Sequence, residues 1–413
     1  MIEPIVLARA VHFAATVLAA GTVSFMVLVA ELAFAGAGGI RALRRRCNIM
    51  TWAALGVAVL SGAAWLALLG ADVYDAPAIE VLLNGKLWPV LTGTQFGAVW
   101  TSRLALALLL ALLLVWPALR WLQLAAAAAL IGMLAFVGHA GATPGPAGAV
   151  HLTSDIAHLI AAGAWLGGLP ALAWLLLLRQ GPDLAARATQ RFSALGIICV
   201  GTLIVSGFVN SWNLLGTPSD LIATGYGQLL TLKFALFVAM LGIAAVNRFY
   251  LTPRLQEAGA QRALARNSLA ESGLGLGIVL LVGALGTMAP PAHAAMPPAD
   301  IPADAAFVHI HSEDAMAEVT VNPGRAGPVN ISIRVLNEDS SEFPTNDVHL
   351  QVAPPTPGHP PVDWAAVPQP DGTWAVDEVV LPQAGNWTVR VIIAREHGKQ
   401  IVLDAPIVIE PPR

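Results

Sequence analysis

Eight stretches of apolar residues recur along the first 290 residues, separated by short polar segments. They lie near 5–35, 49–70, 97–119, 121–140, 150–178, 192–213, 226–249 and 269–289. Each stretch is long enough to cross about 30 Å of hydrocarbon as an α-helix. The pattern predicts an all-α membrane bundle of eight transmembrane helices, with both chain termini on the same side.

Arginine is distributed unequally between the segments that join these helices. One side receives Arg41, Arg44, Arg45, Arg46, Arg120, Arg179, Arg187, Arg191, Arg248, Arg254, Arg262 and Arg266. The segments on the opposite side contain a single basic residue, Lys86. Because positively charged loops stay in the cytoplasm, we expect both termini to face outward, together with segments 71–96, 141–149 and 214–225.

The hydrophobic pattern changes after Met288. A Pro- and Ala-rich segment, 291–305, precedes short runs in which apolar and polar residues alternate, as in Val329–Val335. Such alternation is typical of a strand with one buried face. About seven such runs predict a small all-β, immunoglobulin-like sandwich over 306–413. The predicted organisation is a transmembrane domain over 1–290, a linker and an outward-facing β-domain.

Composition supports a lipid-embedded chain and excludes several functions. Charged residues make up 12% of the sequence, against roughly 25% in soluble domains, and mean hydropathy is +0.68. No basic patch indicates nucleic-acid binding. The only cysteines, Cys47 and Cys199, provide neither a disulfide framework nor a CxxC metal site. Because no GxxxxGK[ST] phosphate loop occurs, we expect no ATP-driven step. We also expect that the protein is not an enzyme.

Four histidines fall in the predicted membrane region, all toward its outer end. His12 lies about two helical turns below the outer end of the first span, and His158 lies at a similar depth in the fifth. His139 and His151 flank one outward segment. Asp155 shares a helix face with His151 and His158.

These imidazoles are candidate metal ligands. Neutral imidazole commonly binds copper and zinc, and a carboxylate such as Asp155 can hold a ligand imidazole in the required tautomer. The sequence therefore predicts a metal-binding vestibule open to the outside. The alternative for each His is a hydrogen-bonded packing residue. Other polar residues at this level are costly to expose to lipid and must face one another or water: Arg9, Arg103, Asn210 and Lys233.

The β-domain contains a second pair of candidate ligands. His309 and His311 are two residues apart in a predicted strand, so they share one face. This pair is a candidate for copper capture. An ordinary polar strand face is the alternative.

Four motifs stand out in the membrane region: Arg9-Ala10-Val11-His12-Phe13, Gly138-His139-Ala140, the run from His151 to Leu169, and the Tyr226-Gly227…Lys233…Asn247-Arg248 pattern. With these motifs, the chain resembles the copper resistance protein D (CopD) family of bacterial inner-membrane proteins. The resemblance implies copper transport across the inner membrane, usually inward, with His12, His139, His151 and His158 as copper ligands. It also implies a periplasmic copper chaperone of the CopC type as a partner, sometimes fused to the chain as a β-sandwich like this one.

Three functions remain open from the sequence. The first is copper transport without ATP hydrolysis, from the periplasm to the cytoplasm. The second is electron transfer through b-type haem, because paired histidines on membrane helices can ligate haem iron. The third is a copper-binding sensor or assembly factor that transports nothing. The inner half of the predicted bundle contains no His, which disfavours a chain of haems across the membrane.

Overall fold

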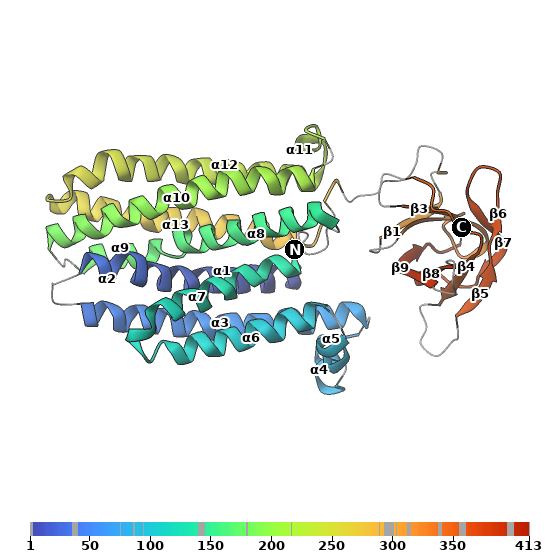
Figure 1. The fold of residues 1–413 in the computed structure, drawn as a ribbon, viewed down its shortest axis with the longest axis horizontal. Coiled ribbons are helices and arrows are strands. Elements are labelled where there is room, and N and C mark those ends of the chain that lie inside the picture. Colours follow the sequence, from blue (N-terminus) through green and yellow to red (C-terminus); the bar gives the residue numbers. More distant parts are fainter. Residues whose placement is uncertain are drawn as a thin grey trace. The chain divides into compact units, whose positions relative to one another are not determined.

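The structure is a computed structural model that describes residues 3–412 with short gaps. The residues left out within this range are 35–39, 75, 86, 94, 139–144, 179–180, 216, 289, 293–300, 303, 312–314, 338–340, 355–360 and 395–399. The chain forms two compact units, Met1–His293 and Ala294–Arg413. The first is helical and the second consists of strands (Figure 1).

The helical unit consists of long helices joined by short segments. Its α-helices are α1 Pro4–Phe25, α2 Glu31–Ala33, α3 Ile40–Val73, α4 Ala78–Leu83, α5 Leu87–Gly93, α6 Gln95–Leu113, α7 Arg120–Gly132, α8 Gly145–Leu166, α9 Leu169–Leu177, α10 Pro182–Leu214, α11 Asp220–Ala223, α12 Gly225–Val246 and α13 Ala258–Leu285. Two π-helical turns, η1 Met26–Ala30 and η5 Asn247–Leu251, extend α1 and α12. The 3₁₀ segments are η2 Pro117–Leu119, η3 Met133–Val137 and η6 Thr252–Arg254.

Among the described residues, eight helical segments are long and apolar enough to cross a membrane. They are Pro4–Ala33, Ile40–Asp72, Phe96–Leu113, Pro117–Val137, Gly148–Leu177, Pro182–Leu214, Gly225–Arg254 and Gly259–Leu285. The predicted eight-helix bundle is therefore confirmed. Several spans combine two helices, because π, 3₁₀ or glycine turns interrupt the α-helix without ending the apolar run.

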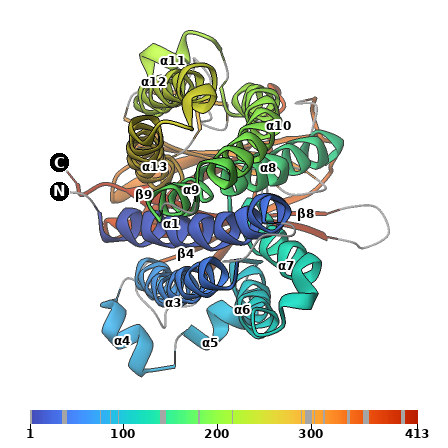
Figure 2. The ribbon, with the colours of Figure 1, turned by 90° about the vertical axis from the view of Figure 1, so that its left-hand side faces the viewer.

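Helix α1 occupies the middle of the bundle. It packs on α3 and α7 on one side and on α8 and α13 on the other. Figure 2 shows α1 between these two groups of helices. We call the end where α1 begins the N-terminal end of the bundle, and the opposite end the arginine-rich end, because Arg44, Arg120, Arg248 and Arg254 lie there.

Glycines set the close approach of α1 and α8. A Cβ atom at Gly21 would collide with the backbone of Gly167, and one at Gly167 would collide with the carbonyl oxygen of Val17. Small residues permit such crossings between membrane helices. The Trp165-Leu166-Gly167-Gly168 sequence also separates α8 from α9, so one element both brings the helices together and breaks the fifth span.

At the arginine-rich end, Glu31 forms ion pairs with two arginines. Its carboxylate oxygens lie 2.8 Å from Arg44 and 3.0 Å from Arg120. These contacts join the end of the first span to the segments that begin the second and fourth.

The second unit is a β-sandwich of two antiparallel sheets. Its strands are β1 Ala306–His311, β2 Met316–Asn322, β3 Gly327–Leu336, β4 Val348–Ala353, β5 Val362–Ala365, β6 Val367–Pro368, β7 Trp374–Leu381, β8 Gly385–Ala394 and β9 Gln400–Ile409. One sheet has the order β1-β2-β3-β7-β6 and the other β5-β4-β8-β9. The predicted sandwich is confirmed. Two short strands that flank Ala366 raise the described strands above the expected seven.

The alternating apolar residues of the strands fill the space between the two sheets. Val329, Ile331 and Ile333 of β3 are buried, as are Val389 and Val391 of β8. They belong to one cluster that receives side chains from both sheets. Period-two patterning alone therefore accounts for which strand faces point inward.

Candidate functional site

His12 is held by two helices on one side of α1. Its Nδ1 atom lies 2.8 Å from the carbonyl oxygen of Ala58 in α3, and its Nε2 atom lies 2.8 Å from Nη2 of Arg103 in α6. Arginine has only donors, so Nε2 accepts and Nδ1–H donates to the carbonyl. His12 is therefore a neutral imidazole with its proton on Nδ1, and it is only 5% exposed.

Arg103 connects this group to one further helix, α7, and back to α1. It donates to the carbonyl oxygen of Leu130 in α7, and to Thr16 Oγ1 at 3.2 Å. Thr16 in turn donates to the carbonyl of His12, one turn earlier in α1, at 2.8 Å. The buried guanidinium thus donates its hydrogen bonds to neutral acceptors, and we call these residues the His12–Arg103 group.

A small cavity of about 20 Å³ lies beside the His12–Arg103 group. Trp100, Leu104 and Ala107 of α6 line it together with His12 and Arg103. This volume is close to that of one water-sized probe. The group therefore has space for one small atom or ion next to the imidazole.

A second polar group lies on the other side of the bundle, between α8, α10 and α12. Asn210 of α10 donates to Oδ1 of Asp155 at 2.9 Å. Nδ1 of His158 lies 2.9 Å from Oγ of Ser206, which itself donates to the carbonyl of Thr202 at 2.6 Å. The single hydroxyl proton of Ser206 is thereby used, so Nδ1–H of His158 donates and Nε2 carries the lone pair.

Lys233 of α12 supplies the positive charge of this second group. Its ammonium interacts electrostatically with Asp155 and with His158, and Tyr226 of the same helix interacts with Asp155. No hydrogen bond from the described residues occupies Nε2 of His158. We call this the Asp155–Lys233 group. It combines a carboxylate, an ammonium and one imidazole nitrogen with a lone pair.

The structure describes three of the four predicted ligands. His12 belongs to the first polar group, and His158 belongs to the second with Asp155. His151 is buried on the same face of α8 as His158. His139 lies outside the described residues. Within the described part of the chain, no three His, Cys, Asp or Glu side chains come close enough together to hold one metal ion.

Sequence reasoning missed the direct contact between Arg103 and His12, and it missed the carboxylate Glu271. Glu271 lies in the middle of the last span, is 1% exposed, and accepts a hydrogen bond from Asn247. The sequence contained the same signal for Arg103 and for Glu271, because a charged side chain within an apolar helix needs a partner or a function.

In the β-sandwich, Nδ1 of His309 lies 3.3 Å from Oε1 of Glu318 on the neighbouring strand. Arg334 lies 3.6 Å from the other oxygen of Glu318. The backbone of His311 pairs with Met316, and its side chain lies outside the description. His309 is therefore already engaged with a carboxylate, the kind of partner that orients a ligand imidazole.

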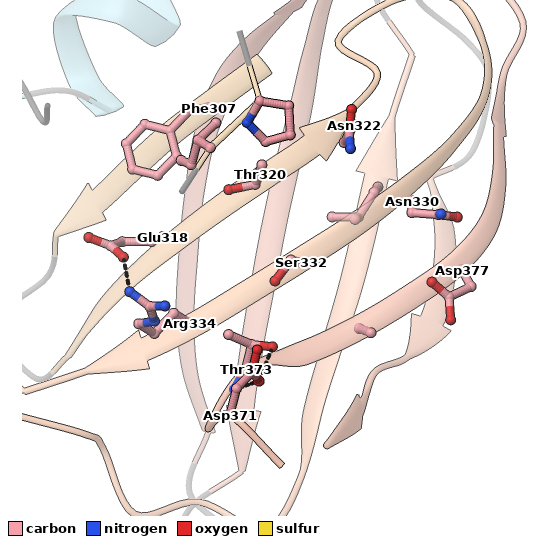
Figure 3. Close-up of a pocket in the computed structure, with 14 residues that line it drawn as sticks. Phe307, Glu318, Thr320, Asn322, Asn330, Ser332, Arg334, Asp371, Thr373 and Asp377 are labelled. Atoms are coloured by element: carbon pink, nitrogen blue, oxygen red, sulfur yellow. Dashed lines mark hydrogen bonds and ion pairs between the residues drawn. The ribbon is translucent and has the colours of Figure 1, made fainter. Parts of the chain in front are cut away.

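A pocket of about 330 Å³ lies on the polar face of the sheet that contains β2, β3 and β7 (Figure 3). Polar side chains line it, including Thr320, Ser332, Asp377 and Asp371. Hydrogen bonds from the side chain and backbone of Thr373 lower the pKa of Asp371. The described lining contains no His, Cys or Met, so this pocket lacks the donors that favour copper.

Comparison with known proteins places the helical unit in a family. The family model for copper resistance protein D matches residues 186–285, and the model for the copper resistance protein D-like N-terminal domain matches residues 1–149. No solved structure matches the chain.

Three curated relatives have similar sequences. Inner membrane protein YebZ of Escherichia coli (strain K12) is 30% identical over 289 residues, which cover 68% of this chain and 97% of the relative. Copper resistance protein D of Pseudomonas syringae pv. tomato is 30% identical over 227 residues, 50% of this chain and 73% of the relative. Copper transport protein CutJ of Bacillus subtilis (strain 168) is 31% identical over 268 residues, 62% of this chain and 47% of the relative. On this coverage, the chain belongs to the copper resistance protein D family.

Proposed function

We propose that this protein transports copper through the bacterial inner membrane, from the periplasm to the cytoplasm, and that it is not an enzyme. The arginine-rich end is the cytoplasmic end by the positive-inside rule, so the N-terminus and the β-sandwich face the periplasm. One relative is named a copper transport protein and another a copper resistance protein, which supports copper as the cargo.

The observation that carries this proposal is the Asp155–Lys233 group. A carboxylate, an ammonium and an imidazole inside apolar helices are expensive in a membrane and are normally kept for function. The lone pair on Nε2 of His158 can bind a copper ion, while Asp155 supplies negative charge nearby. His151, on the same face of α8, is the second ligand in this proposal.

Copper binding at this site depends on the charge of Lys233. A copper cation that approaches Asp155 competes with the ammonium for the same carboxylate. Binding therefore requires Lys233 to move away or to lose its proton. Such competition keeps the ion weakly held, and weak binding allows it to leave again toward the cytoplasm.

The driving force needs no ATP. An inside-negative membrane potential favours inward movement of a cation by about 2.3 kcal/mol per charge for each 100 mV. The β-sandwich, or a separate periplasmic chaperone of the CopC type, would supply the ion, with His309 and His311 as capture ligands. Ligand exchange between neutral imidazoles then brings copper into the bundle.

Copper uptake into proteoliposomes tests the proposal. The purified full-length chain should take up copper faster than empty liposomes, and His158→Ala should reduce the rate at least about tenfold, the effect of losing roughly 1.4 kcal/mol. His349→Ala is the matched control, because His349 is an imidazole of the sandwich outside both membrane groups. Uptake no faster than in empty liposomes would reject transport.

The haem alternative has its own test. Both ring nitrogens of His12 are hydrogen-bonded, and Nδ1 of His158 donates to Ser206, so only one of these two imidazoles keeps a lone pair for iron. We expect the purified protein to show no Soret absorption. A stoichiometric Soret band would replace the transport proposal with electron transfer. Stoichiometric copper binding without uptake would support the sensor or assembly factor.

A further inference from the structure

A buried polar network lies in the helical unit, apart from both groups described above. Glu271 of α13 is 1% exposed. Nδ2 of Asn247 donates to its Oε1 at 2.6 Å, and Nδ2 of Asn267 donates to Oδ1 of Asn247 at 2.8 Å. Asn247 lies fourteen residues beyond Lys233 in the same span, about 21 Å further toward the arginine-rich end. We call these residues the Glu271 network.

No cation compensates Glu271 among the described residues. Its only hydrogen-bond partner there is the neutral amide of Asn247, and no charged side chain acts on it. A carboxylate inside a bundle is very unfavourable when it is ionised and unpaired. Glu271 therefore needs a proton or a bound cation.

The charged groups on the elements packed against α13 are all engaged elsewhere or exposed. Arg248 of η5 donates to Ser193, and Arg254 of η6 lies over the Tyr250 ring. On α1, Arg9 lies beside Gly286, fifteen residues from Glu271. The remaining titratable groups on these helices belong to the two polar groups described above or to the same face of α8: His12 of α1, His151, Asp155 and His158 of α8, and Tyr226 and Lys233 of α12. On α13 itself, Arg262 and Arg266 are exposed.

Two further observations point to a binding site. Ser268, one turn before Glu271, is 1% exposed, and its hydroxyl oxygen is buried without a hydrogen-bond partner among the described residues. Asn247 begins a π-helical turn, a distortion that occurs frequently at functional sites. Both features reduce stability, so we attribute them to binding: Ser268 lies one helical turn from Glu271, and Asn247 donates to the Glu271 carboxylate.

We propose that the Glu271 network is a proton-binding site that exchanges its proton for the transported cation. Without copper, Glu271 is a neutral carboxylic acid. When the cation reaches this depth, the O–H bond of the acid breaks, the proton passes to water at the arginine-rich end, and the carboxylate compensates the cation. No electrons are transferred.

The number of oxygen atoms available to bind an ion favours a proton over a sodium ion. Asn247 already donates to Oε1, so the side chains of the network leave three oxygen atoms for a cation: Oε2 of Glu271, the hydroxyl of Ser268 and Oδ1 of Asn267. Cations that prefer oxygen take six or more ligands when they bind in protein sites, as calcium does. A proton needs only one oxygen atom.

The exchange rests on the proposed copper transport, whereas proton binding itself is tested without copper. Infrared spectroscopy of the metal-free, full-length protein should show the carbonyl stretch of a buried carboxylic acid at neutral pH. Glu271→Gln should remove this band, and Glu257→Gln, at an exposed position just before α13, should retain it. A wild-type spectrum without such a band would overturn the proposal.

Asn267→Ala covers the case in which Glu271→Gln does not fold. It removes the amide that positions Asn247 but keeps the carboxylate, so the band should remain and its titration midpoint should move. An unmoved midpoint would show that the network does not act on Glu271. The spectra are repeated with choline in place of sodium. A band that changes with sodium would overturn the assignment to a proton.

Coupling is measured in proteoliposomes that contain a pH-sensitive dye. Copper uptake by the wild type should be accompanied by proton movement, and Glu271→Gln should lose at least nine tenths of it. Uptake with no proton movement would overturn the exchange. If the wild type takes up no copper, the transport proposal and the exchange fail together, while the infrared result still decides whether Glu271 binds a proton.

Discussion

Nη2 of Arg103 lies 2.8 Å from Nε2 of His12 and donates a hydrogen bond to it. This nitrogen carries the lone pair that a metal ion would use, because Nδ1–H is directed at the carbonyl of Ala58. His12 is thus protected from cations by a guanidinium that is itself buried. Copper can bind His12 only after Arg103 has been displaced.

Removing Arg103 should therefore strengthen copper binding at His12. A hydrogen bond to a charged group contributes about 1.5–3 kcal/mol, so Arg103→Met should raise Cu(I) affinity by at least about tenfold. Competition with a chromogenic Cu(I) chelator measures the change. The gain should disappear in the double variant with His12→Ala. Thr16→Val is the control: it removes the 3.2 Å contact to Arg103 and the hydrogen bond to the carbonyl of His12 but leaves the guanidinium on Nε2. Unchanged affinity in Arg103→Met would contradict the prediction.

Asp155 and Lys233 should depend on each other for stability. Asp155→Asn leaves the ammonium without its carboxylate, and Lys233→Met leaves the carboxylate without its ammonium. Each single variant should lower the free energy of unfolding by about 3 kcal/mol, and the double variant should recover most of this loss. Unfolding in detergent completes the double-mutant cycle. Additive losses would show that the two charges are independent.

The crossing of α1 and α8 should tolerate no side chain at Gly167. Gly167→Ala places a Cβ against the Val17 carbonyl and should lower the free energy of unfolding by about 1–3 kcal/mol. Gly201→Ala, in a different span, has open space around it and should be neutral or slightly stabilising. Thermal unfolding in the same detergent compares the two. Equal melting temperatures would show that the crossing is less tight than described.

Protonation of Asp363 should make the sandwich less stable in acid. Hydrogen bonds from Gln351 and His349 lower its pKa in the folded state. The ionised carboxylate therefore stabilises the folded state. This contribution is complete above the pKa of Asp in the unfolded chain, about 3.9, and it is lost as the pH falls through the lower pKa of the folded state. Calorimetry of the full chain across this range should show a smaller pH dependence in Asp363→Asn.

Gln351→Leu provides the complementary measurement. It removes one donor to Asp363 and leaves the carboxylate, so the pH dependence should shrink only in part. A pH dependence that is identical in the wild type and both variants would assign the acid sensitivity of the sandwich to other carboxylates.

Hydrophobic patterning was sufficient to predict the eight spans and the sandwich. A membrane helix satisfies its backbone hydrogen bonds within itself, so length and hydropathy identify it without knowledge of its neighbours. The strands of 306–413 were equally visible, because Val329, Ile331 and Ile333 repeat with the period of the pleat. Short strands such as Val367–Pro368 were missed because two residues carry no period.

The sequence by itself determined which residues lie at which depth, including the level shared by His12, Asp155, His158 and Lys233. Depth follows from the rise along a helix, a property of each helix alone. Only the tertiary structure decided their partners, because rotation and neighbours depend on packing between helices distant in sequence. It assigned His12 to Arg103, His158 to Ser206, and Asp155 to Asn210 and Lys233. The histidines at one level thus became members of two separate polar groups.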